Sequence, residues 1–93
     1  MSITTDKDNV TALLTKGGNP ARNQYVITHP NGDKTFISYE TRIAEWRSGA
    51  LVLDVNADDY SQTTSAYLNQ FSGMTKPERR KAADTLTYED LNA

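Results

Sequence analysis

The stretch that decides the fold is residues 24–39, QYVITHPNGDKTFISY, in which two β-prone runs flank an Asn-Gly pair. An Asn-Gly pair between two such runs is the strongest short-range signal for a β-hairpin, because both residues tolerate the positive φ of a tight turn. We therefore expect one hairpin with strands at residues 24–28 and 34–39. Tyr25 and Ile27 should share one face of its first strand, since side chains alternate along a strand.

A second hairpin is expected on the C-terminal side of the first. Residues 42–46 and 50–55 are separated by Arg47-Ser-Gly49, which places glycine at the tight position. Residues 50–55, ALVLDV, form the most apolar run in the chain, so we expect them to be a central strand. Residues 40–41 fit either a turn or a bend within one long strand, so the count of antiparallel strands stays open at three or four.

Helices are expected at both ends of this sheet. Residues 6–16, DKDNVTALLTK, place Val10, Leu13 and Leu14 at helical spacing and predict a short N-terminal helix. Residues 60–72 predict a second helix that ends at Gly73. Thr75 and Glu78 fit a capping box, which predicts a third helix through residues 79–86. We expect one α+β domain over residues 1–93, with an antiparallel meander, a short N-terminal helix, two C-terminal helices and a frayed tail at 87–93.

Composition limits the classes of protein that the chain can belong to. It has 93 residues, 37% of them hydrophobic, no cysteine and a net charge of -2. The absence of cysteine excludes disulfides and cysteine-ligated metal sites. No apolar run approaches the ~20 residues that span a bilayer, so we expect a soluble protein without membrane contact. A pI near 5.2 disfavours nonspecific binding to nucleic acid.

Neither catalysis nor metal binding is indicated. His29 is the one histidine, and the sequence nominates no nucleophile or orienting partner for it, so we expect no enzyme and no cofactor. Asp54, Asn56 and Asp58 match the start of an EF-hand calcium loop. The sixth position is Asp59 instead of glycine and the twelfth is Ser65 instead of glutamate, so we expect no metal. Asp58 or Asp59 is then expected to cap the helix that follows.

The segment 59–71, DYSQTTSAYLNQF, is polar yet carries no charge after Asp59. Its aromatic and aliphatic residues, Tyr60, Tyr67, Leu68 and Phe71, fall on roughly one helical face and are expected to cover the sheet. The opposite face holds residue types that are typical of adaptable binding surfaces. The candidate partner-binding residues are Gln62, Thr63, Ser65, Asn69 and Gln70.

One basic cluster offers a second kind of site. Lys76, Arg79, Arg80 and Lys81 are candidates for contact with phosphate from the start of a helix. Glu78 interrupts the cluster, so a solvated helix face is the favoured interpretation. A nucleic-acid-binding module using residues 76–81 remains the alternative function.

Three segments carry a resemblance to a known family: FISYETRIA at 36–44, LVLD at 51–54, and DYSQTTSAYLNQF at 59–71. Together they resemble small proteins of unknown function from tailed bacteriophages, with the pattern F-x-S-Y-x-T-x-I-A, then L-D, then D-Y-S-x-T-T-S-x-Y-x-N-Q-F. The resemblance implies a protein made in the cytoplasm of an infected bacterium. It brings no catalytic or binding residues to transfer.

The expected function is therefore that of a non-enzymatic phage accessory protein that binds a host protein, such as a host defence or takeover target. Besides the nucleic-acid-binding module, a minor virion or assembly component is a further alternative. If the chain forms a homodimer, we expect contact through residues 50–55 or the face that carries Tyr67 and Phe71.

Overall fold

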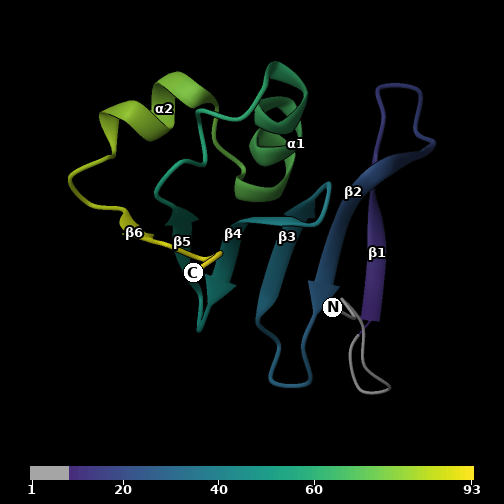
Figure 1. Cartoon of the computed structure of the whole chain (residues 1–93), viewed down its shortest axis with the longest axis horizontal. Coiled ribbons are helices and arrows are strands. Elements are labelled where there is room, and N and C mark those ends of the chain that lie inside the picture. The colour runs from purple at the N-terminus through teal and green to yellow at the C-terminus, as the bar shows by residue number, and fades with distance from the viewer. Residues whose placement is uncertain (1–8) are drawn as a thin grey trace.

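A six-stranded mixed sheet carries two short helices (Figure 1). The computed structural model describes residues 9–93. The elements are β1 (Asn9–Leu14), β2 (Pro20–Thr28), β3 (Lys34–Ser38), β4 (Thr41–Arg47), β5 (Ala50–Asp54), α1 (Gln62–Ser72), α2 (Lys76–Lys81) and β6 (Thr87–Glu89). Strands β1 to β5 follow one another in chain order, each antiparallel to the next, and β6 forms the last edge of the sheet, parallel to β5. The chain thus forms one sheet whose last strand returns after the helices.

The predicted N-terminal helix is wrong. Residues Asn9–Leu14 form strand β1, which pairs with β2 through contacts such as Val10 with Ile27, and residues 6–8 lie outside the described part of the chain. Leu13 is buried, whereas Val10 and Leu14 are 36% and 49% exposed, so the three residues do not share one face. An apolar spacing over so few residues fits either element, and pairing with β2 decides in favour of a strand.

The expected meander of three or four strands is also wrong in number. Tyr39 and Glu40 make a tight turn between β3 and β4, so the two predicted hairpins contribute four separate strands, and β1 and β6 extend the sheet. The two hairpins themselves are confirmed. Tyr25 pairs with Ile37 across the first, and the second turns at Ser48 and Gly49 with φ of 53° and 82°.

Both C-terminal helices are present but shifted from their expected bounds. Ser61 caps α1, because its side chain accepts a hydrogen bond from the Thr64 amide, and the cap is neither Asp58 nor Asp59. Gly73 ends α1 in the left-handed region at φ 74°, as expected. The predicted capping box at Thr75 and Glu78 starts α2, which ends at Lys81 well before residue 86.

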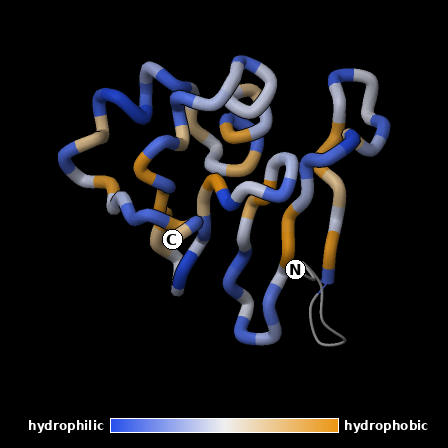
Figure 2. Tube along the Cα trace, viewed as in Figure 1, coloured by the Kyte–Doolittle hydropathy of each residue, from blue (hydrophilic) through white to orange (hydrophobic). Residues whose placement is uncertain are grey.

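The hydrophobic core lies between α1 and the sheet. Phe36, Ala44, Leu53 and Leu68 are fully buried there. The Phe36 and Phe71 rings pack with centroids 5.6 Å apart, and a hydrogen bond of 3.0 Å from Trp46 Nε1 to the Phe71 carbonyl ties α1 to β4. Figure 2 shows hydrophobic residues along the strands, whereas α2 is hydrophilic throughout. Of the predicted apolar face, Tyr67, Leu68 and Phe71 pack in or against the core, whereas Tyr60 precedes α1 and is 41% exposed.

The segment expected to fray is held by a buried carboxylate. Thr87–Glu89 forms β6, and Leu91 is buried. Asp54, 1% exposed, accepts hydrogen bonds from the Leu91 amide at 3.0 Å and from Asn92 Nδ2 at 3.3 Å. The Tyr60 hydroxyl donates to the same carboxylate at 2.8 Å. Burial by itself raises the pKa of Asp54, but the donors around it outweigh burial and lower the pKa below its ordinary value.

We expect Asp54→Asn to lower the free energy of unfolding at pH 7 by about 2–3 kcal/mol, because hydrogen bonds to charged groups contribute about 1.5–3 kcal/mol. The pKa of Asp54 is lower in the folded state than in the unfolded chain. Its contribution is therefore complete above the unfolded pKa of about 4 and is lost as the pH falls through the folded value. Urea denaturation between pH 7 and pH 3 should show that the difference in free energy of unfolding between Asp54→Asn and the wild type becomes smaller as the pH falls. Asp84→Asn, at an exposed carboxylate, is the control, and a gap independent of pH would contradict the prediction.

Candidate functional site

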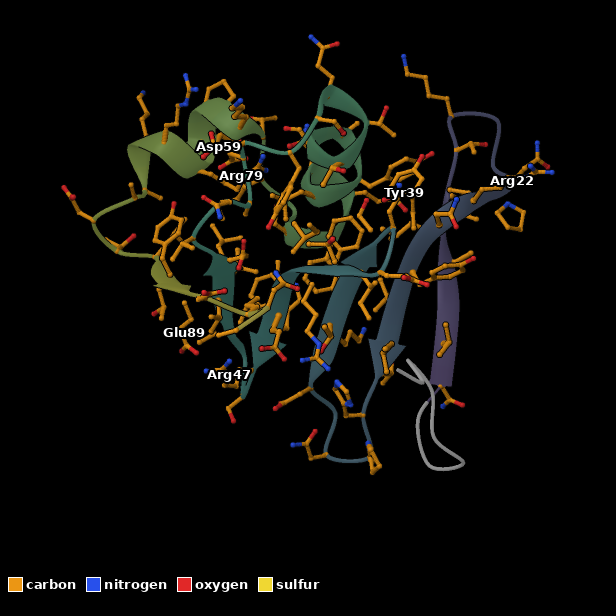
Figure 3. The ribbon with its side chains drawn as sticks, viewed as in Figure 1. Arg22, Tyr39, Arg47, Asp59, Arg79 and Glu89 are labelled. Carbon is orange, nitrogen blue, oxygen red and sulfur yellow. The ribbon has the colours of Figure 1, made fainter. Side chains whose placement is uncertain are left out.

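The region around α1 is organised by one buried guanidinium. Arg79, on α2, is 0% exposed and reaches towards the loop that precedes α1 (Figure 3). Its Nη2 lies 2.6 Å from Asp58 Oδ1, and its Nε lies 3.1 Å from the same oxygen. Its Nη1 donates to Asn69 Oδ1 at 2.8 Å and to the Met74 carbonyl at 2.6 Å. Arg79 therefore joins α2, α1 and the β5–α1 loop.

Of the four residues predicted to contact phosphate, two are bonded inside the protein and two are exposed. Arg79 is engaged inside the protein, and Lys76 Nζ donates to the Asp58 carbonyl at 3.1 Å. Arg80 and Lys81 are exposed. Two of the four cations, Arg80 and Lys81, therefore face solvent and have no side-chain partner among residues 9–93.

Of the five predicted partner-binding residues, three are hydrogen-bonded inside the protein and two are exposed. Asn69 and Ser65 face Arg79, with Ser65 Oγ 3.5 Å from Nη2. Gln70 pairs with the β1 backbone: its Oε1 accepts from the Leu14 amide at 3.1 Å, and its Nε2 donates to the Leu14 carbonyl at 2.9 Å. Gln62 and Thr63 remain exposed at the first turn of α1. These two are the predicted contact residues whose side chains make no hydrogen bond within residues 9–93.

A groove of about 490 Å³ runs between α1 and the tip of the β1–β2 hairpin. Its lining residues are Leu14, Thr15, Lys16, Gln62, Thr63, Ala66, Tyr67 and Gln70. Leu14, Ala66 and Tyr67 supply its apolar surface, and Lys16 is its one charged residue. The Gln70 bridge to Leu14 fixes the two walls relative to each other.

A second hollow of about 590 Å³ lies on the other side of α1. It is lined by Asp58, Asp59, Tyr60, Ser61, Gln62, Ser65, Ala66, Asn69 and Lys76 and is more polar than the groove. Gln62 and Ala66 belong to both concavities, and Thr63 stands beside them. We call Gln62, Thr63 and Ala66 the α1 ridge. It carries no charge and stands between two hollows.

The sheet face opposite α1 holds a different polar group. His29 Nε2 lies 2.9 Å from the Thr35 hydroxyl, which donates to Glu45 Oε2 at 3.1 Å. Arg47 pairs with Glu45 at 2.9 Å and with Glu89 at 2.8 Å (Figure 3), so the row ties β4 to β6. These hydrogen bonds join β3 to β4 and, across β5, β4 to β6, which gives the row a structural role. Within residues 9–93, no three His, Asp or Glu side chains gather so that they could hold a metal ion, and no helix is long and apolar enough to cross a membrane.

Sequence reasoning missed one wall of the groove. Leu14 was placed on the apolar face of a helix, whereas Thr15 and Lys16 were placed at that helix's end. No local signal marks these residues as partners of α1, because their position depends on β1 folding back onto β2 and on the long-range Gln70 contact.

We expect Arg79→Met to lower the free energy of unfolding by about 3–5 kcal/mol, because it leaves the Asp58 carboxylate partly buried without its cation. Arg80→Met is the matched control: it makes the same chemical change at the neighbouring exposed position and should stay within about 0.5 kcal/mol of the wild type. Arginine and methionine have similar helix propensities, so burial is the variable that differs. Urea denaturation measures both, and equal losses would contradict the role assigned to Arg79.

A comparison with known protein families identifies a match over most of the chain. Residues 9–87 match the family of unknown function DUF8033, which covers the sheet through the start of β6 together with both helices. Neither the curated proteins nor the solved structures contain a match to the chain. Since the match spans most of the sequence, the chain belongs to the family of unknown function DUF8033.

Proposed function

We propose that this chain is a non-enzymatic accessory protein of a tailed bacteriophage and that it acts by binding a protein of the host. In this proposal it works in the cytoplasm of the infected bacterium against a defence or takeover target. The observation that carries the binding role is the uncharged α1 ridge beside an apolar-lined groove. The phage setting follows from the resemblance in residues 36–44, 51–54 and 59–71.

The ridge and the groove fit the way proteins recognise each other. Interface cores are depleted in charged residues, and their rims are polar. Leu14 and Tyr67 provide apolar contact inside the groove, while the amide of Gln62 and the hydroxyl of Thr63 can donate and accept hydrogen bonds at its edge. Leu14 is 49% exposed, so a partner that covers it would remove apolar surface from water.

The groove also has a fixed shape before a partner arrives. Gln70 holds the β1 wall to α1 with two hydrogen bonds, and Arg79 holds α1 to α2. A site that is already ordered avoids the entropy that a flexible surface loses on binding. This rigidity favours the groove as a binding surface.

Nucleic-acid binding through α2 is the weaker alternative. Sequence-independent affinity for nucleic acid grows with the number of cations that neutralise phosphates. Arg79 is buried against Asp58, and the exposed Asp59 lines the same hollow as Lys76. Two exposed cations, Arg80 and Lys81, make a small footprint for this function.

The test is affinity capture by tagged protein from lysates of a panel of bacteria, each divided into nuclease-treated and untreated halves. Captured proteins are identified by mass spectrometry, purified and titrated against the chain. We expect a partner that survives nuclease and that Ala66→Arg weakens at least about 30-fold, because a charged side chain in the centre of an interface removes about 2 kcal/mol or more.

Ala83→Arg is the matched control, since it introduces the same side chain at an exposed position after α2 and away from the groove. It should leave the affinity unchanged. Partners that disappear with nuclease would instead support nucleic-acid binding. Equal effects of the two substitutions would remove the α1 ridge from the proposal, and self-association of the free chain would favour the assembly role.

A further inference from the structure

Two hairpin turns of the sheet have positive φ at both turn positions but unlike residues there. The β4–β5 turn places Ser48 and Gly49 at φ 53° and 82°, and the β3–β4 turn places Tyr39 and Glu40 at φ 49° and 69°. Two-residue turns with positive φ at both positions favour Asn-Gly, Asp-Gly or Gly-Gly. Ser48-Gly49 approaches this preference, whereas Tyr39-Glu40 departs from it at both positions. A bulky residue in the left-handed region is strained.

The Tyr39 side chain makes few contacts that would offset this strain in the folded chain. It is 60% exposed, the largest fraction among the exposed large hydrophobic residues. Its hydroxyl makes no hydrogen bond within residues 9–93. The turn is fastened by its backbone, because the Tyr39 amide donates to the Asn23 carbonyl at 2.9 Å, and any residue other than proline would make that bond. The identity of residue 39 is therefore not explained by the stability of the turn.

The strained turn is connected to the first turn of α1. Ser38, which precedes it, has its hydroxyl 3.0 Å from that of Thr64 in the first turn of α1. Figure 3 shows Tyr39 in the space between α1 and β2, with Arg22 beyond it. Gln62 and Thr63 occupy the same first turn of α1 as Thr64. The turn that carries the exposed Tyr39 ring is thus joined through Ser38 to the first turn of α1, where the α1 ridge begins.

We infer that Tyr39 is the anchor residue of the binding surface and inserts into an apolar pocket of a partner protein that ends in a hydrogen-bond acceptor. The inference rests on the proposed function and names the chemistry of the partner. Tyrosine is among the residues that dominate interface energies, since a rigid ring buries a large area and its hydroxyl needs a partner once buried. A tight turn presents that ring with little freedom to lose on binding.

The test compares Tyr39→Asn with Ser48→Asn, which makes the equivalent turn-favouring change in the matched hairpin. Thermal unfolding should show a higher Tm for Tyr39→Asn, by about 4–8 °C, because relief of about 1 kcal/mol of strain shifts a domain of this size by that amount. Ser48→Asn should raise Tm by less, since serine is the smaller departure. Binding is measured with nuclease-treated bacterial lysates and then with the identified, purified partner.

We expect Tyr39→Asn to weaken that partner at least about 30-fold while Ser48→Asn leaves it unchanged. A variant that is more stable but binds less well has lost an anchor and has not simply unfolded. Equal binding by Tyr39→Asn and the wild type would overturn the anchor role and leave the proposed function standing. A fall in Tm would show that the ring stabilises the fold and would overturn the argument from strain. Capture of no partner by the wild type would overturn both proposals.

Discussion

The arrangement of the C-terminal half depends on the contact between Arg79 and Asp58. A short helix such as α2 has little intrinsic stability, and its one fully buried side chain is a charged one. A guanidinium without solvent must have its donors satisfied, and the carboxylate, the Asn69 amide oxygen and the Met74 carbonyl together accept from them. These acceptors come from the β5–α1 loop, from α1 and from the connection between the helices. The ion pair therefore determines the relative positions of three segments, which an apolar contact would specify less strictly.

A second buried acid gives the same kind of order to the chain terminus. Asp54 and Asp58 lie four residues apart on either side of one turn, and both are used as internal acceptors: Asp54 for the tail and Asp58 for α2. In sequence these residues resemble the start of a calcium loop. In the fold, their oxygens are occupied by amide, hydroxyl and guanidinium donors, as expected of a small domain that buries a limited apolar surface. Buried polar contacts therefore fix the positions of segments that the small hydrophobic core does not fix.

Local signals account for the parts of the fold that could be predicted. The Asn-Gly pair, Ser48-Gly49 and the capping box at Thr75 each act through neighbouring residues, and each produced the expected turn or helix start. The errors concern long-range contacts. Strand β1 depends on pairing with residues 20–28, β6 depends on β5 and Asp54, and the burial of Arg79 depends on Asp58. Within the run KPERRK, nothing local distinguishes the buried arginine from its exposed neighbour Arg80.

The same distinction applies to the candidate site. Some polar residues of a helix stabilise the fold and others are available to a partner. Internal hydrogen bonds in the structure distinguish the first group from the second. Ser65, Asn69 and Gln70 are engaged inside the chain, whereas Gln62 and Thr63 are exposed at the first turn of α1. A sequence under selection for stability alone would favour asparagine or glycine at position 39. The exposed tyrosine there, in a strained turn that Ser38 joins to the first turn of α1, is the physical reason to look for a protein partner at this end of α1.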